Sequence, residues 1–229
     1  MREIVFDTET TGFDPTSGDR IVEIGAVELL NHLPTGRTYQ EYINPERAMP
    51  EGAFQVHGLG DDFLKDKPVF AKIAQGFLNF VGDATLVAHN AAFDFKFVNA
   101  ELGWLNLAPI PWERAIDTLE IARKRFPGSP ASLDALCRRF GVDTTARTLH
   151  GALLDSEILA EVYLELIGGR QPDFGLAGNA AKTGVDAVDT WRPRPRQTPL
   201  ASLLSEKEAA AHAEFVEKLG DDSVWKKLV

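Results

Sequence analysis

The sequence has almost no cysteine and no long hydrophobic run, and each absence excludes a class of protein. Cys137 is the only cysteine among 229 residues, which excludes an internal disulfide framework and a site built from several thiolates. The apolar runs stay far below the roughly 18 residues that a membrane-spanning helix needs. The first residues lead directly into a strand-like stretch and show no export signal. We therefore expect a cytoplasmic protein.

An excess of positive charge is missing as well. The chain has 24 Lys and Arg residues against 34 Asp and Glu residues, a formal net charge of -10. Residues 1–169 contain 15 basic and 25 acidic side chains, whereas residues 170–229 contain nine of each. Such a chain has no extended basic face with which to hold a polyanion by charge alone. If it acts on one, we expect carboxylate-bound divalent cations to make the contact and a partner to add affinity.

What the sequence does contain is a run of strands followed by strands that alternate with helices. Three short segments rich in β-branched and aromatic residues, 2–9, 21–30 and 37–43, predict consecutive antiparallel strands. From residue 69 onward, apolar residues at helical spacing predict helices between two further short strands. These elements are helices at 69–81, 93–102, 119–126, 132–140 and 151–167, and strands at 85–88 and 115–118. The pattern indicates an α/β fold, a mixed sheet flanked by helices.

The composition changes after Gly169, and we predict three parts. Residues 1–169 form a folded domain, residues 170–204 a flexible linker rich in small residues and then in Pro and Arg, and residues 205–229 a tail. Ser205 and Glu208 have the spacing of a capping box at the start of a short amphipathic helix. A short helix without a core of its own usually needs a partner.

Two carboxylates lie in the first predicted strand. Asp7 and Glu9 are two residues apart, and alternate side chains of a strand project to the same face. Two like charges at the end of an apolar strand are costly unless hydrogen bonds or a cation compensate them, and a hard divalent cation does this well. A turn-capping aspartate beside a solvated glutamate is the alternative interpretation.

Two further acidic residues and a histidine lie near predicted helix starts. Asp94 follows the buried strand 85–88, where helix capping is the alternative explanation. In the helix beginning near Gly151, Asp155 shares a face with apolar residues and so needs a counter-charge. His150 stands directly before that helix, within reach of the same site.

Together these five residues match the motif set of the DEDDh exonucleases. More closely, the chain resembles the epsilon subunits of bacterial DNA polymerase III over about residues 2–169, and only loosely in the tail. The segments that carry the resemblance are Asp7-Thr-Glu-Thr-Thr-Gly12, Val56-His-Gly58, His89-Asn-Ala-Ala-Phe-Asp94, Ser132-Leu-Asp-Ala-Leu-Cys137 and Arg147-Thr-Leu-His-Gly-Ala-Leu-Leu-Asp155.

The resemblance implies a ribonuclease H-like fold with a five-stranded mixed sheet and a proofreading 3′–5′ exonuclease. It implies two divalent cations, Mg²⁺ or Mn²⁺, with Asp7, Glu9 and Asp155 holding one. Asp7 would bridge to the second cation, which Asp94 would steady through water. His150 would be the general base, a role suited to imidazole because histidine as a class titrates near neutral pH. The product would be a nucleoside 5′-monophosphate.

The same resemblance suggests contacts to substrate and partners. Residues at positions where the family touches the terminal nucleotide are Thr10, His57, His89, Asn90 and Phe93. Each has a structural alternative, and for Asn90 a helix cap is the preferred one. Residues that fit the pattern of peptides docking on the beta sliding clamp are Gln171, Phe174 and Leu176. The tail over 205–229 would bind the alpha subunit of the polymerase.

Two other functions fit part of the sequence. An RNA-trimming DEDDh exoribonuclease would share the catalytic residues, but such enzymes generally end near the last catalytic helix. A non-catalytic subunit bridging polymerase and clamp would explain the tail, yet it has no use for clustered carboxylates.

Overall fold

The computed structural model describes residues 1–145, 147, 149–169 and 204–219. The chain divides into two compact units, Met1–Leu176 and Ala177–Val229. Among the described residues, no helix combines the length and the apolar character needed to cross a membrane.

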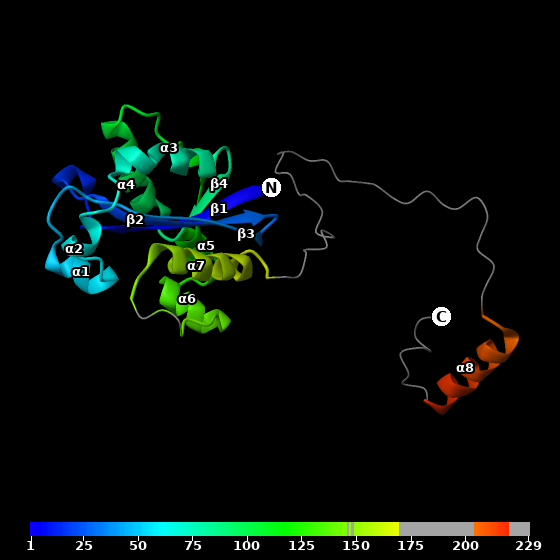
Figure 1. Ribbon diagram of the computed structural model, residues 1–229. Coiled ribbons are helices and arrows are strands. Elements are labelled where there is room, and N and C mark those ends of the chain that lie inside the picture. The colour runs from blue at the N-terminus through cyan, green and yellow to red at the C-terminus, as the bar shows by residue number, and fades with distance from the viewer. Residues whose placement is uncertain (146, 148, 170–203, 220–229) are drawn as a thin grey trace, which may run out of the picture. The chain divides into compact units, whose positions relative to one another are not determined.

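The first unit is built on a five-stranded mixed sheet, as the resemblance implied (Figure 1). Its strands are β1 (Arg2–Thr10), β2 (Ile21–Leu30), β3 (Leu33–Tyr42), β4 (Thr85–Ala88) and β5 (Ala115–Asp117). They lie in the order β3-β2-β1-β4-β5. The first three strands are antiparallel neighbours, whereas β4 and β5 run parallel to β1. The carboxyl ends of β1, β4 and β5 therefore meet at one edge, where Asp7 and Glu9 lie near the end of β1 and Asp94 follows β4.

Helices cover both faces of this sheet (Figure 1). Their bounds are α1 (Glu51–His57), α2 (Asp61–Leu64), α3 (Phe70–Val81), α4 (Ala91–Trp104), α5 (Thr118–Arg125), α6 (Leu133–Phe140) and α7 (Ala152–Leu166), with 3₁₀ turns at Pro15–Ser17 and Trp112–Arg114. On one face, the largest core cluster joins the sheet to α3 and α4 through side chains such as Phe6, Phe77 and Phe97. On the other, Val5, Val87 and neighbouring apolar residues pack against α7.

Two parts of this unit differ from the sequence-based expectation. β3 begins at Leu33, four residues before the predicted strand, because Asn31 and His32 both adopt positive φ (51° and 66°) and close a tight hairpin. Asparagine and histidine tolerate that conformation better than most residues. Helices α1 and α2 were not predicted, since each buries a single residue and so carries no apolar period.

Close contact between β2 and α7 fixes this helix on the sheet. A Cβ atom at Gly25 would lie 2.0 Å from the backbone nitrogen of Leu153, so only glycine allows this approach. Ser156 Oγ donates a hydrogen bond to the Gly25 carbonyl (2.9 Å), and the Ala152 amide donates to Glu23 Oε2 (3.1 Å). The first turn of α7, which carries Asp155, is therefore held directly against the sheet.

In the second unit, the described residues form one helix, α8 (Glu206–Lys218). The predicted capping box is present: the Glu208 amide donates to Ser205 Oγ (3.3 Å), and the Ser205 amide donates to Glu208 Oε2 (2.9 Å). All described residues of this unit are exposed except Val216, which is half-buried. Phe215 and Leu219 leave apolar surface on a helix that has no core of its own.

Candidate active site

The site begins with the two carboxylates of β1. Asp7 and Glu9 project to the same face of the sheet as Val5, the face covered by α7. Burial and the neighbouring Asp94, Glu9 and Asp155 carboxylates raise the pKa of Asp7 well above its ordinary value. Burial, followed by repulsion from Asp155, raises the pKa of Glu9 to about 8. Both side chains are thus held where their negative charges are poorly compensated.

A second glutamate increases the negative charge around Glu9. Glu23 of β2 is directly opposite Glu9 in the antiparallel ladder and is 2% exposed. Burial raises the pKa of Glu23, although hydrogen bonds from Gln40 Nε2 (2.8 Å) and the Ala152 amide oppose that shift. Glu23 is therefore engaged in holding α7, and its charge also disfavours ionisation of Glu9.

Asp94 reaches the site from the first turn of α4. It is 2% exposed and accepts a hydrogen bond from Thr8 Oγ1 at 2.7 Å. Burial raises the pKa of Asp94 to about 7, with the Thr8 hydroxyl acting in the opposite direction. This bond ties the start of α4 to β1, the strand that carries Asp7 and Glu9.

Asp155 lies in the first turn of α7 and is 3% exposed. The Arg147 guanidinium contacts both of its carboxylate oxygens, with Nε at 2.6 Å from Oδ1 and Nη2 at 2.8 Å from Oδ2. His150 Nδ1 lies 3.2 Å from Asp155 Oδ2 and 2.8 Å from Arg147 Nη2. The His150 backbone is anchored to α1, since its amide donates to the Val56 carbonyl (3.3 Å).

The arrangement fits a divalent cation. Glu9, His150 and Asp155 each offer one ligand atom, and these atoms lie within 4.8 Å of one another. Asp7 and Asp94 are not part of that group. The Asp94 carboxylate acts to raise the pKa of both Asp7 and Glu9, and the Glu9 carboxylate acts to raise that of Asp7. Oxygen-rich ligand sets suit hard ions such as Mg²⁺ and Mn²⁺. Buried carboxylates with raised pKa values are groups whose ionised form a bound cation would stabilise.

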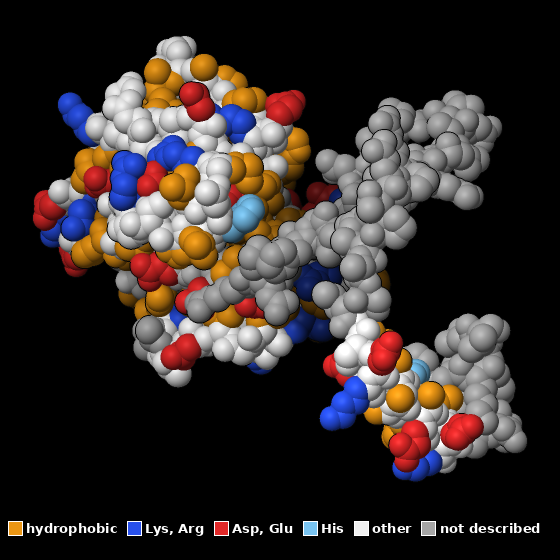
Figure 2. Space-filling view, turned by 90° about the vertical axis from the view of Figure 1, so that its right-hand side faces the viewer, with side chains coloured by type: hydrophobic (Ala, Val, Ile, Leu, Met, Phe, Trp, Pro, Cys, Tyr) orange, Lys and Arg blue, Asp and Glu red, His pale blue; other side chains and the backbone are white. Residues whose placement is uncertain are grey.

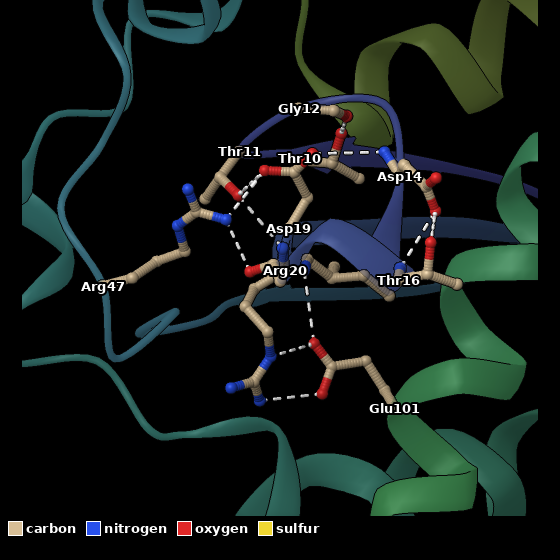
Figure 3. A network of polar contacts seen from close by, with 11 residues as sticks. Thr10, Thr11, Gly12, Asp14, Thr16, Asp19, Arg20, Arg47 and Glu101 are labelled. Carbon is tan, nitrogen blue, oxygen red and sulfur yellow. Dashed lines mark hydrogen bonds and ion pairs between the residues drawn. The ribbon is translucent and has the colours of Figure 1, made fainter.

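The loop that follows β1 is fixed by a polar network (Figure 3). The Asp19 carboxylate accepts hydrogen bonds from the Thr11 hydroxyl (3.2 Å), the Asp14 amide (3.1 Å) and Arg47 Nη1 (2.8 Å). A Cβ atom at Gly12 would lie 2.3 Å from Asp19 Oδ2, so any other residue there would displace the Asp19 carboxylate from this network. The backbone directly after Glu9 is therefore held in one conformation.

A buried ion pair anchors the other end of this loop (Figure 3). Arg20 donates two hydrogen bonds of 2.8 Å to Glu101, which is 2% exposed, and the Ile21 amide donates a third at 3.3 Å. The Arg20 guanidinium also lies over the Trp104 ring, 4.9 Å from its centroid. The pair links the start of β2 to α4, the helix that carries Asp94.

Two of the residues predicted to touch substrate lie beside the acidic cluster. Thr10 is buried, and its hydroxyl donates to the Gly12 carbonyl at 2.6 Å. His57 is 5% exposed, its Nδ1 accepts from the Leu59 amide (3.0 Å), and burial lowers its pKa. The Thr10 backbone acts to raise the pKa of His57 and a charge on His150 acts to lower it, so both groups lie near the His57 ring.

The other three follow β4. His89 Nδ1 lies 2.9 Å from Thr118 Oγ1, and burial lowers the pKa of His89. Phe93 is partly buried against the main core, with its ring centroid 4.9 Å from that of Phe97. Asn90 occupies the N-cap position of α4, but its side chain makes no capping hydrogen bond. Its φ of 65° gives a different reason for asparagine, which accepts the left-handed conformation more readily than most residues.

Sequence reasoning missed three residues of the site: Thr8, Glu23 and Arg147. A glutamate inside the apolar strand 21–30 was a usable signal for Glu23, because a buried charge there needs partners. Thr8 and Arg147 stand inside two of the segments that carry the resemblance, but their local sequence does not show that Thr8 bonds Asp94 on α4 or that Arg147 bonds Asp155 on α7 and Asp134 on α6. The predicted clamp-binding residues Gln171, Phe174 and Leu176 lie outside the described residues.

The surface agrees with the acidic composition. On the face shown in Figure 2, Lys and Arg side chains of the first unit are interspersed with acidic and apolar ones and form no continuous basic surface. On this face, charge alone gives the described residues little grip on a polyanion.

Fold and site define a metal-dependent nuclease, and comparison with known proteins gives the family. The family model described as Exonuclease matches residues 4–163. The solved structure of exonuclease X in complex with 5′ overhanging duplex DNA is 26% identical, with a TM-score of 0.57 over 72% of this chain and 90% of that chain. The nuclease domain of 3′hExo, a DEDDh family member bound to rAMP, has the same fold, with 21% identity and a TM-score of 0.62 over 72% of this chain and 91% of that one.

Curated relatives that match nearly the whole chain identify a narrower group within this family. Proteins named DNA polymerase III subunit epsilon are 49% identical in Rickettsia felis, covering 96% of this chain and 97% of the relative, and 41% identical in Escherichia coli, covering 98% and 97%. The chain belongs to the exonuclease family and, within it, to the DNA polymerase III epsilon subunits. The predicted function, a 3′–5′ exonuclease of the proofreading type that depends on divalent metal, is confirmed by this membership.

Proposed function

We propose that this chain removes mispaired nucleotides from the 3′ end of DNA, with four carboxylates as metal ligands and His150 as general base. The proposed ligands are Asp7, Glu9, Asp94 and Asp155. The observation that carries the proposal is the convergence of Glu9, His150 and Asp155, whose ligand atoms lie within 4.8 Å of one another beside two more buried carboxylates. A site of this composition has no structural role that would offset its charge repulsion.

Each residue then has a definite task. Glu9, Asp155 and Asp7 would hold one cation, and Asp7 and Asp94 would contribute to holding a second. Two Mg²⁺ or Mn²⁺ ions, when bound, would stabilise charge on the scissile phosphate and on the leaving 3′ oxygen. His150, 48% exposed at the mouth of the site, takes a proton from the attacking water at a ring nitrogen. Because Glu9 and Asp94 must be ionised to bind a cation, binding releases protons and strengthens as pH rises.

The substrate assignment can be tested with labelled oligonucleotides. In Mg²⁺, the chain should remove a mismatched 3′-terminal nucleotide from a DNA primer faster than a matched one and faster than it shortens RNA of the same sequence. EDTA should stop all digestion. A preference for RNA would instead identify an RNA-trimming enzyme, and a chain that digests neither substrate would fit the bridging role.

We further propose that the tail over 205–229 binds the alpha subunit of the polymerase and that Gln171, Phe174 and Leu176 bind the sliding clamp. The exposed Phe215 and Leu219 of α8 support the first part, because a short helix with exposed apolar residues gains stability from a partner. Phe215→Asp should lower the fraction of chain that co-purifies with the alpha subunit while nuclease activity on single strands stays unchanged. Equal co-purification of variant and wild type would contradict this role of α8.

A further inference from the structure

Arg147 is the one basic side chain that reaches the described acidic cluster, and the proposed mechanism gives it no task. Its guanidinium contacts three groups at once: both oxygens of Asp155, Nδ1 of His150 and, through Nη1, Oδ1 of Asp134 on α6. The Arg147 side chain is only 10% exposed, so these charges meet largely away from water. The Nη2 contact with Asp155 Oδ2 is a charge-assisted hydrogen bond, whereas the Nε contact with Oδ1 is an ion pair without hydrogen-bond geometry. Charge-assisted hydrogen bonds are among the stronger polar interactions in proteins.

The first consequence concerns Asp155. Both of its oxygens are engaged by Arg147, at 2.6 and 2.8 Å. A divalent cation bound by Glu9 and Asp155 would have to share this carboxylate with a fixed positive charge. Like charges on one buried carboxylate repel strongly, so binding of the cation and pairing with Arg147 oppose each other.

The second consequence concerns His150. A guanidinium can only donate hydrogen bonds, so the 2.8 Å contact requires Nδ1 of His150 to accept. The neutral ring then carries its proton on Nε2, and its one lone pair faces Arg147. The 3.2 Å approach of the same Nδ1 to Asp155 is the longer of its two contacts. While Arg147 stays in this position, His150 has no free lone pair with which to accept a proton from water.

Arg147 also has a partner that it can keep when it leaves Asp155. Asp134 is paired with Nη1 and is 57% exposed, so this pairing can persist when the contact with Asp155 is broken. A surface pocket of about 200 Å³ is lined by Asp134, Thr144, Arg147, Leu149 and His150. The guanidinium therefore has space beside it and a carboxylate that continues to hold it.

We propose that Arg147 is a latch that competes with the divalent cation for Asp155 and covers the base lone pair of His150 until the cation displaces it and leaves it paired with Asp134 alone. The latch compensates the charge of Asp155 and blocks the base until a cation takes its place. It also sets the cation concentration at which the enzyme becomes active. This inference rests on the proposed metal ligands Glu9 and Asp155.

The test is a titration of the metal-stripped full-length protein with Mn²⁺, with free Mn²⁺ counted by electron paramagnetic resonance. Arg147→Met keeps the length of the side chain and removes its charge, so the Mn²⁺ dissociation constant should fall about tenfold. Arg147→Lys keeps the charge but not the two-pronged contact, and should give an intermediate value. Arg138→Met, at an exposed arginine in the last turn of α6, is the matched control and should bind like wild type.

The outcomes separate this inference from the proposed function. If wild type binds Mn²⁺ and Arg147→Met binds it equally or more weakly, Arg147 does not compete with the cation and the latch is refuted. If wild type binds no Mn²⁺ at millimolar concentration, the metal ligands themselves are wrongly assigned. Should Arg147→Met fail to fold, as judged by circular dichroism, Arg147→Lys decides the question: tighter binding than wild type supports the latch, and unchanged or weaker binding overturns it.

Discussion

Asp7→Asn combined with Glu9→Gln is expected to reduce digestion of a mismatched DNA 3′ end in Mg²⁺ roughly 1000-fold or more. The two amides keep the shape of the side chains but remove two of the negative charges that would hold the cations. Loss of metal-centred stabilisation of several kcal/mol corresponds to a rate loss of this size. The measurement is the initial rate of release of the terminal nucleotide under single-turnover conditions, with circular dichroism to verify the fold.

A matched control removes the same two charges elsewhere. Glu157 and Glu161 are on the exposed side of α7, the helix that carries Asp155. Glu157→Gln combined with Glu161→Gln should leave the rate within about twofold of wild type, because exposed charges are well screened. Near-normal activity of the Asp7 and Glu9 variant would refute the site assignment.

The same variant should be more stable than wild type when metal is removed. The folded protein raises the pKa of Glu9 to about 8 and of Asp94 to about 7, from ordinary values of 4.5 and 3.8. At pH values between the unfolded and the folded pKa of each group, the folded state keeps a proton that the unfolded state has released. The unfolding free energy of the wild type therefore falls as pH rises from about 5 to 8. Because amides do not ionise, replacing Asp7 and Glu9 by amides removes part of this fall in unfolding free energy.

Urea unfolding in EDTA at two pH values measures this effect. At pH 8 the variant should gain on the order of 2 kcal/mol in unfolding free energy relative to wild type. The gain should shrink toward pH 5, where the wild-type groups are already protonated in the folded state. Lower stability of the variant at pH 8 would mean that Asp7 and Glu9 are well compensated by other groups, contrary to the charge repulsion described above.

His150→Ala is expected to lower the single-turnover rate roughly 100-fold or more at neutral pH, the usual scale for loss of a general base. His150 is at the start of α7, and its side chain is 48% exposed, so removing the imidazole should leave the packing of the helix intact. The metal ligands Glu9 and Asp155 remain, and the variant should still bind Mn²⁺. A defect in rate without a comparable defect in metal binding distinguishes a base from a ligand.

The rate profile against pH gives a second readout. Wild type and variant should both lose activity as pH falls below neutrality, because Glu9 and Asp94 take up protons and bind the cation less tightly. Saturating Mn²⁺ should diminish this loss in both, while the difference in rate between them remains. His212→Ala, the same substitution in α8 of the other unit, should leave the rate unchanged. If His150→Ala works at a near-normal rate, His150 has no part in proton transfer.

Most of the architecture could be predicted from the sequence, because strands and helices each leave a characteristic spacing of apolar residues along the chain. The two-residue period placed Asp7 and Glu9 on one face of β1, and the helical period placed Asp155 on the buried face of α7, where the structure has them. The same local reasoning missed α1 and α2, because each buries only one residue and so shows no helical repeat of apolar residues. It also placed the start of β3 too late, because Asn31 and His32 are an uncommon pair for a hairpin turn.

By itself, the sequence determined the fold class, the order of the elements and the carboxylates that come to one edge of the sheet, because strand and helix periods are properties of neighbouring residues. Only the tertiary structure decided which groups those carboxylates meet. Glu23 lies opposite Glu9 through strand register, Thr8 bonds Asp94 across elements, and Arg147 joins Asp134, His150 and Asp155. Such pairings depend on register and on close helix-to-sheet contact at Gly25, which arise only when distant segments pack together.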